Sequence, residues 1–261
     1  MAGAFATSLN GLLRRDRIVV VFGLLGVILL CWAYLLSGAG MSMHEMDGML
    51  MPMSAGPWTP GYAAVVLVMW AVMMAAMMLP SAAPMILFYD TIARARRSKG
   101  GSATASGIFA SGYVAVWAAF SLVAVALQFG LDEAILLSPM MQTTSTVVAG
   151  AVLIAAGLYQ WTPLKHACLR RCRSPLDFVM THWREGPSGA FIMGIQHGAF
   201  CVGCCWMLML LLFVGGVMNV SWIATLAAFV LVEKLAPAGY WIGRAAGAFL
   251  IAWGGVTLFA T

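Results

Sequence analysis

Residues 189–213 read GAFIMGIQHGAFCVGCCWMLMLLLF and contain no Asp, Glu, Lys or Arg. As an α-helix, a stretch of this length crosses the roughly 30 Å hydrocarbon core of a bilayer. Apolar and polar residues do not alternate along it, as they would in a strand of a membrane barrel. The stretch therefore predicts a transmembrane helix, and this prediction decides the fold class.

Six further apolar segments have the same character. They are residues 18–36, 62–79 with a continuation to 89 left open, 106–129, 143–159, 218–232 and 240–259. The whole chain of 261 residues is 62% apolar and 9% charged, whereas a soluble domain is about 25% charged. We therefore expect an all-α membrane protein, a single polytopic domain over residues 1–261 with a bundle of about seven transmembrane helices. This composition excludes a soluble enzyme, a disordered chain and a disulfide-stapled secreted domain.

The basic residues predict the orientation of the bundle. All 14 Lys and Arg residues lie before the first span, after the second, fourth and sixth spans, or in the first turn of the seventh. The connections on the other side carry acidic residues and neither Lys nor Arg. The positive-inside rule then places the N-terminus in the cytosol and the C-terminus in the periplasm of a bacterial inner membrane. The net charge of +5 is explained by topology, so we expect the lipid bilayer and no nucleic acid as a partner.

Residues 37–61 are expected to form a methionine-rich periplasmic loop. Its centre, MSMHEMDGMLMPM at 41–53, holds six methionines and one histidine. Thioether sulfur is a soft ligand that selects Cu(I) over hard ions. We expect this loop to capture the metal through Met43, His44, Met46 and Met49. The alternative is an amphipathic segment on the membrane surface, with methionine as adaptable filler.

The second span carries a methionine stripe. At 100° per residue, Met69, Met73 and Met77 share one face of a helix, and Met74 and Met78 lie on an adjacent stripe. The first three are candidate ligands along a soft-metal path. The alternative is ordinary packing, because methionine is also a common core residue.

The fifth span has the sharpest pattern. His197, Cys201, Cys204 and Cys205 fall on one face of a helix. The spacing Gly194-xxx-Gly198 on the same side, like Gly243-xxx-Gly247 in the seventh span, allows close helix packing. We expect this face to meet other helices and to offer thiol and imidazole ligands. The alternative is that cysteine acts as a small apolar residue and that His197 bonds a neighbouring helix.

Two further features lie on the expected cytosolic side. The segment 162–187 contains Cys168 and Cys172, four residues apart beside arginines, which could receive a metal ion or could belong to a basic membrane-surface segment with reduced thiols. Glu233, at the end of the sixth span, is expected to pair with Arg244 across a short turn.

Several of these blocks together resemble a bacterial family of unknown function labelled as predicted metal-binding integral membrane proteins. The matching blocks are residues 69–80, 159–165 with Cys168 and Cys172, 203–209, 216–219 and 233–234. The resemblance implies a multi-span, metal-binding membrane protein. It implies no particular metal, substrate or mechanism.

The leading hypothesis is a protein that binds Cu(I) in the inner membrane and either transports it or delivers it to a periplasmic or membrane cuproprotein. The chain has no Gly-x-x-x-x-Gly-Lys-Ser/Thr motif, so transport would not use its own ATP site. One alternative is a thiol/quinone oxidoreductase that uses Cys201 and Cys204. Another is a non-catalytic accessory subunit of a larger membrane complex. We favour a non-enzymatic role.

Overall fold

The computed structural model describes residues 2–39, 43–46, 49–52, 58–97, 105–138 and 141–259, with side chains for 18–39, 58–96, 105–138 and 141–259. In chain order the elements are α1 (Ala2–Leu36), β1 (Met43–Met46), β2 (Met49–Pro52), α2 (Pro60–Arg97), α3 (Ser106–Glu133), α4 (Thr146–Tyr159), α5 (Pro163–Arg173), α6 (Pro175–His182), α7 (Gly186–Leu210), α8 (Leu212–Gly215), α9 (Val220–Leu235) and α10 (Gly239–Phe259). Apart from the short hairpin β1–β2, every element is a helix, which agrees with the expected fold class.

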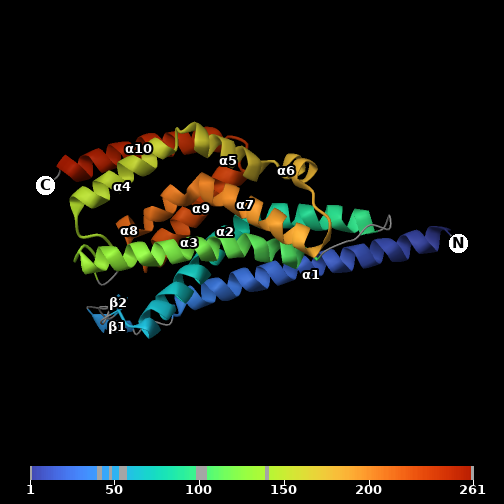
Figure 1. Cartoon of the computed structure of the whole chain (residues 1–261), viewed down its shortest axis with the longest axis horizontal. Coiled ribbons are helices and arrows are strands. Elements are labelled where there is room, and N and C mark those ends of the chain that lie inside the picture. Colours follow the sequence, from blue (N-terminus) through green and yellow to red (C-terminus); the bar gives the residue numbers. More distant parts are fainter. Residues whose placement is uncertain are drawn as a thin grey trace.

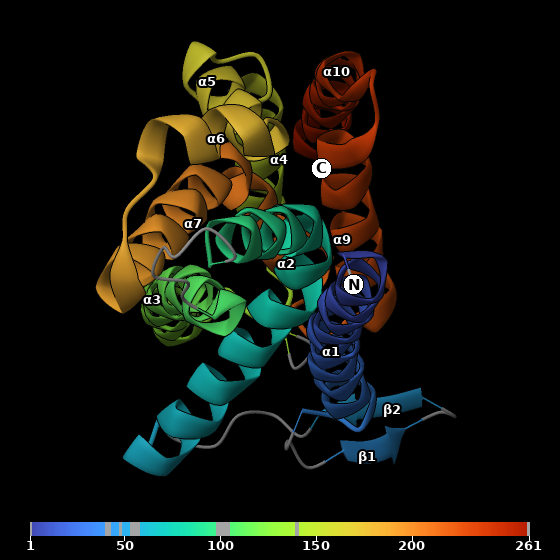
Figure 2. The ribbon, with the colours of Figure 1, turned by 90° about the vertical axis from the view of Figure 1, so that its right-hand side faces the viewer.

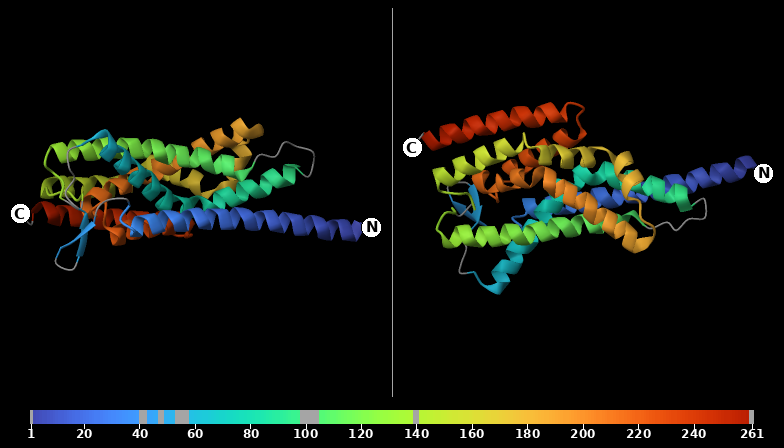
Figure 3. Two further views of the ribbon diagram at one scale, coloured as in Figure 1. Left: turned by 90° about the horizontal axis from the view of Figure 1, so that it is seen from below. Right: turned by 45° about the horizontal axis from the view of Figure 1, so that its top comes forward.

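The helices run along the long axis of the molecule, and the two termini lie at its opposite ends (Figures 1 and 3). Five helices in the described residues are long and apolar enough to cross a membrane, namely α2, α3, α10, the apolar part of α1 and α7 continued by α8. A sixth span is formed if α4 and α5, which meet at a bend of 64°, count as one broken span. The chain is thus compatible with a multi-pass membrane protein.

Two expected spans are too short on their own to cross a bilayer core. Helix α9 has 16 residues and helix α4 has 14, which is about 24 Å and about 21 Å of helix. The count of seven spans and the cytosolic position of the N-terminus therefore stay predictions.

Two expected segments differ in form from the structure. The methionine-rich segment is not only loop, because β1 and β2 pair in antiparallel fashion with His44 opposite Met51 and Met46 opposite Met49. Helix α2 does not end near Leu79 but continues through Pro80 and Pro84 to Arg97. Proline bends a helix by removing a backbone bond, and Figure 2 shows α2 changing direction along its length.

Glycines bring α7 against α3. A Cβ atom added at Gly194 would collide with the carbonyl of Phe109, and one added at Gly112 with the carbonyl of Phe191. In α10, a Cβ at Gly247 would meet the carbonyl of Gly157 in α4. Both small-residue spacings in the sequence are therefore confirmed as close helix contacts.

Five helices surround the part of the core that holds the soft side chains. Helices α2 and α7 both pack against α3, and both also contact α9. The bend after α4 also lays α5 against α7. Side chains from α2, α3, α5, α7 and α9 can consequently meet in one interior region.

Candidate metal centre

The thiols of α7 point into this interior. Cys201, Cys204 and Cys205 are all buried. The Cys204 thiol donates to the Cys201 carbonyl oxygen at 3.1 Å, and the Cys205 thiol donates to the same oxygen at 2.9 Å. The expected shared face therefore exists, and it turns toward protein rather than lipid.

A fourth thiol comes from α5. The Cys172 thiol is a near neighbour of the thiols of Cys201 and Cys204, since α5 packs against α7. Cys168, one turn earlier, packs its sulfur against Gly203 of α7, where any larger residue would collide with it. The two cysteines expected in a separate cluster thus lie beside the thiols of α7, because the 64° bend turns α5 onto that helix.

The second helix contributes a thioether. The Cys205 thiol lies 4.0 Å from the Met78 sulfur. Met78 belongs to the adjacent stripe and not to the stripe of Met69, Met73 and Met77, which was the one expected to supply ligands. All five methionines between 69 and 78 are buried within the protein.

A buried lysine contacts the same cluster. The Lys234 ammonium donates to the Cys201 sulfur at 2.9 Å and to the Ser81 hydroxyl oxygen at 3.0 Å. The Tyr113 hydroxyl lies 3.1 Å from the Cys201 sulfur and donates to the Met78 carbonyl oxygen at 3.2 Å. Cys201 is therefore the centre of the polar contacts, with one cationic and one neutral hydroxyl partner.

His197 lies on the same helix face but makes different contacts. Its ring packs against Phe109, Tyr113 and Phe178, at centroid distances of 6.1, 5.7 and 5.4 Å. Its Nδ1 atom is buried without a hydrogen-bond partner among the described residues. Burying a polar atom without a partner costs free energy, so this nitrogen is a candidate for binding a ligand. It lies one helical turn from Cys201.

Next to the cluster lies a buried ion pair whose partners differ from the predicted ones. Glu233 was expected to pair with Arg244, but its carboxylate oxygens lie 2.7 and 2.9 Å from the Lys165 ammonium. Lys165 also donates to Gln160. Arg244 instead donates to the Tyr240 hydroxyl oxygen at 2.7 Å. The inward bend of α5 explains this correction, because it brings Lys165 into the core.

The methionine-rich hairpin can be described only by its backbone. Met43, His44, Met46 and Met49 lie in β1 and β2, and the placement of their side chains lies outside the described residues. Their role as a capture site stays a prediction.

The described side chains form a cluster of soft donor atoms, but they do not form a complete coordination geometry for a metal ion. Among the residues whose side chains are described, no three His, Cys, Asp or Glu groups are already arranged to hold a metal ion. The donors are thiol and thioether sulfurs, which prefer Cu(I) to hard divalent ions. The donor chemistry therefore fits a soft metal ion.

Sequence reasoning missed Lys234 and Met78 as parts of this centre. Lys234 was used for the orientation of the bundle and as part of the matching block 233–234, but not as a candidate site residue, although an ionisable residue at the end of an apolar span is by default a functional candidate. Met78 was one position away from the stripe that was favoured. Only the packing of α9 and α2 around Cys201 and Cys205 reveals these two partners.

Comparison with known proteins bears on the metal. Neither the curated proteins nor the solved structures give a match. The PpoB2 family, described as a copper chaperone, matches residues 67–257. This match contains α5, α7, α9 and the part of α2 from Met69 onward, which are the helices whose side chains meet around Cys201 and Cys205. Because it extends over more than half of the sequence, the chain belongs to the PpoB2 copper chaperone family.

Proposed function

We propose that this protein binds Cu(I) in the inner membrane at the sulfur cluster, defined as Cys172, Cys201, Cys204, Cys205 and Met78, and delivers it to a partner cuproprotein. The observation that carries the proposal is the convergence of soft side chains from three helices beside the buried Lys234 ammonium. The Cys205 thiol of α7 lies 4.0 Å from the Met78 sulfur of α2, and the Cys168 sulfur of α5 packs on Gly203 of α7. Membership of a copper chaperone family supports copper as the metal and delivery as the role.

Charge balance favours a monovalent ion at this cluster. An isolated buried charge is costly unless it is paired, and the Lys234 ammonium lies 2.9 Å from the Cys201 sulfur. Two thiolates, one Cu(I) and one ammonium sum to zero. A divalent ion with the same ligands would leave one uncompensated positive charge in the core. The lysine therefore acts as a counter-charge that suits Cu(I) better than Zn(II).

The buried methionines of α2 provide an approach to the cluster. Helix α2 follows the hairpin in the chain, and the hairpin lies at the same end of the molecule as its first turns (Figures 1 and 2). Met69, Met73 and Met77 then continue along the buried part of the helix toward Met78. Thioethers bind Cu(I) without losing a proton, so an ion can pass between them without a change in net charge.

The test is the copper content of protein purified without oxygen and loaded with Cu(I) against a competing chelator. The triple variant C201S/C204S/C205S is expected to retain little or no copper, since serine oxygen is a hard ligand. The matched control is Cys31→Ser, which changes a cysteine of α1 outside the cluster and is expected to retain wild-type copper. Equal copper in the wild type and the triple variant would contradict the proposal.

A second measurement separates delivery from transport. Loaded protein in sealed vesicles is mixed with a metal-free cuproprotein domain on the outside. Transfer to that domain supports delivery, whereas appearance of copper in the lumen indicates transport. Loss of free thiols on addition of a quinone, without any metal, would favour an oxidoreductase instead.

A further inference from the structure

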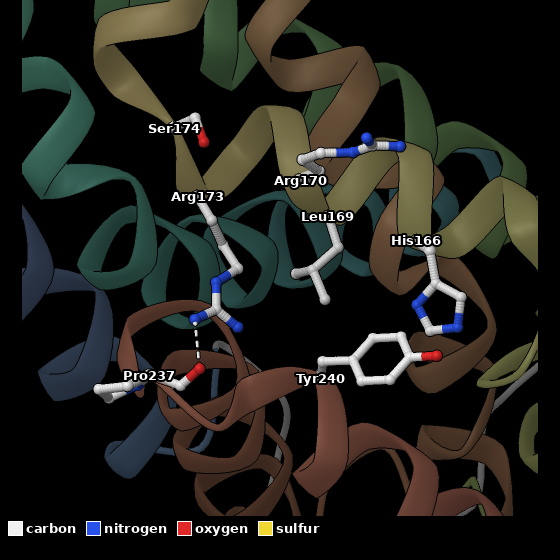
Figure 4. A pocket seen from close by; sticks show the side chains of 7 residues that line it. All are labelled: His166, Leu169, Arg170, Arg173, Ser174, Pro237 and Tyr240. Atoms are coloured by element: carbon white, nitrogen blue, oxygen red, sulfur yellow. Dashed lines mark hydrogen bonds between the residues drawn. The ribbon is translucent and has the colours of Figure 1, made fainter.

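A pocket of about 600 Å³ opens between α5 and the start of α10, apart from the sulfur cluster (Figure 4). Its polar lining consists of His166, Arg170, Arg173, Ser174 and Tyr240. His166, Arg170 and Arg173 are spaced four and three residues apart, so they project from one face of α5. In Figure 4 the side chains of Arg173 and His166 extend from α5 toward Pro237 and Tyr240, whereas the Arg170 side chain lies along α5 at the rim of the pocket.

Arg173 is held in a fixed position. Its guanidinium donates to the carbonyl oxygens of Glu233, Ala236 and Pro237 at 3.2, 2.5 and 3.3 Å. These acceptors are neutral and use only three of the five N–H donors of an arginine. The positive charge of the side chain is therefore not neutralised, and donors remain for a ligand. Because the side chain is already held in place, ligand binding costs it little conformational entropy.

The pocket lacks a balancing negative charge. None of its lining residues is acidic. The nearby Glu233 carboxylate is bound by Lys165, and Asp177 lies 3.9 Å from Arg171. The His166 ring contacts Tyr240 at a centroid distance of 4.6 Å, and its Nδ1 atom has no partner among the described residues. The side chains that line the pocket can therefore donate hydrogen bonds to an anion.

The surroundings of the pocket indicate where such an anion would come from. Trp161 and Trp241 flank the same region and are 46% and 68% exposed. Exposed tryptophans mark the level of lipid headgroups, and basic pockets between helices at this level bind anionic headgroups. Arginine in turn matches the geometry of phosphate oxygens.

We propose that this pocket binds a phosphate group, presented by the headgroup of an anionic phospholipid, through Arg170, Arg173 and His166. The lipid would hold α5 against the start of α10. This site is separate from the copper proposal and does not depend on it.

The test uses purified full-length protein in nanodiscs of phosphatidylcholine with a small fraction of cardiolipin or phosphatidylglycerol. Native mass spectrometry then measures retained anionic lipid. Arg170→Gln removes one exposed donor and is expected to lower retention about tenfold, the scale of one charge-assisted hydrogen bond. The matched control is Arg171→Gln, the next residue of α5, which loses the same charge outside the pocket.

A parallel arm adds inorganic phosphate to protein in phosphatidylcholine alone and measures its binding. Lipid retention that depends on Arg170 and not on Arg171 supports the headgroup as the source. Phosphate binding with the same dependence supports the site with a free anion as its ligand. Equal loss in both variants, or binding of neither probe, would overturn the proposal, because the basic residues would then act only as a diffuse charge.

Discussion

Lys234 is the residue with the sharpest expected effect on copper. Its ammonium contacts the Cys201 sulfur at 2.9 Å inside the protein, so Lys234→Met removes the counter-charge of the proposed copper–thiolate centre. We expect Cu(I) affinity to fall roughly tenfold to a hundredfold, the range for loss of one hydrogen bond with a charged partner. Competition with a Cu(I) chelator measures this change.

The control for Lys234 is Ser81→Ala. It removes the other hydrogen-bond partner of the ammonium, the Ser81 hydroxyl, and leaves the positive charge in place. We expect a much smaller loss of affinity than in Lys234→Met. A Lys234→Met protein with wild-type affinity would show that the lysine has no part in metal binding.

The sequence predicted the thiols better than it predicted their partners. Helical spacing alone places Cys201, Cys204 and Cys205 on one face, and this face is buried as expected. The contacts of Lys234 and Met78 with that face depend on how α9 and α2 pack. Periodicity within one helix carries no information on which helices are neighbours.

At the scale of elements, the buried pair of Lys165 and Glu233 ties α5 to α9. Both side chains are 1% exposed and their charged atoms lie 2.7 Å apart. Lys165→Met leaves a buried carboxylate alone, so we expect a loss of about 3–5 kcal/mol in the free energy of unfolding. The double variant Lys165→Met with Glu233→Leu should recover most of that loss, since both charges are then gone. Unfolding by denaturant in detergent measures the series.

A surface ion pair gives the matched comparison. Arg96 and Glu185 lie 3.1 Å apart, but their side chains are 48% and 56% exposed. Arg96→Gln is therefore expected to change the free energy of unfolding by no more than about 1 kcal/mol. If Lys165→Met were as mild as Arg96→Gln, the buried pair would not be what holds α5 in the bundle.

The observed helices differ from the expected ones in segments where charged residues or breaks in the chain make hydropathy a poor guide to burial. Long apolar segments such as α3 and α7 could be predicted because length and composition suffice. The segment 162–187 was taken as a connection, since it is rich in Arg and Cys. Its first helix, α5, instead packs on α7 with Lys165 buried, because Glu233 of α9 supplies the opposite charge. That compensation comes from a residue far along the chain.

At the scale of the whole molecule, we expect copper to be captured at one site, the hairpin, and to be held at another, the sulfur cluster. The hairpin β1–β2 precedes α2, and the sulfur cluster lies deep between α2, α5, α7 and α9. Replacing Met43, Met46 and Met49 together by serine removes soft ligands from the hairpin but leaves every residue of the cluster. We therefore expect slower loading with Cu(I) and an unchanged final amount of bound copper.

The time course of copper uptake into protein in nanodiscs, compared with its end point, measures this separation. The control replaces Met180 of α6, which is 76% exposed and away from the hairpin, and is expected to change neither rate nor end point. A lower end point in the hairpin variant would mean that the hairpin itself holds part of the copper. An unchanged rate would mean that copper reaches the cluster by another route, which does not include the hairpin methionines.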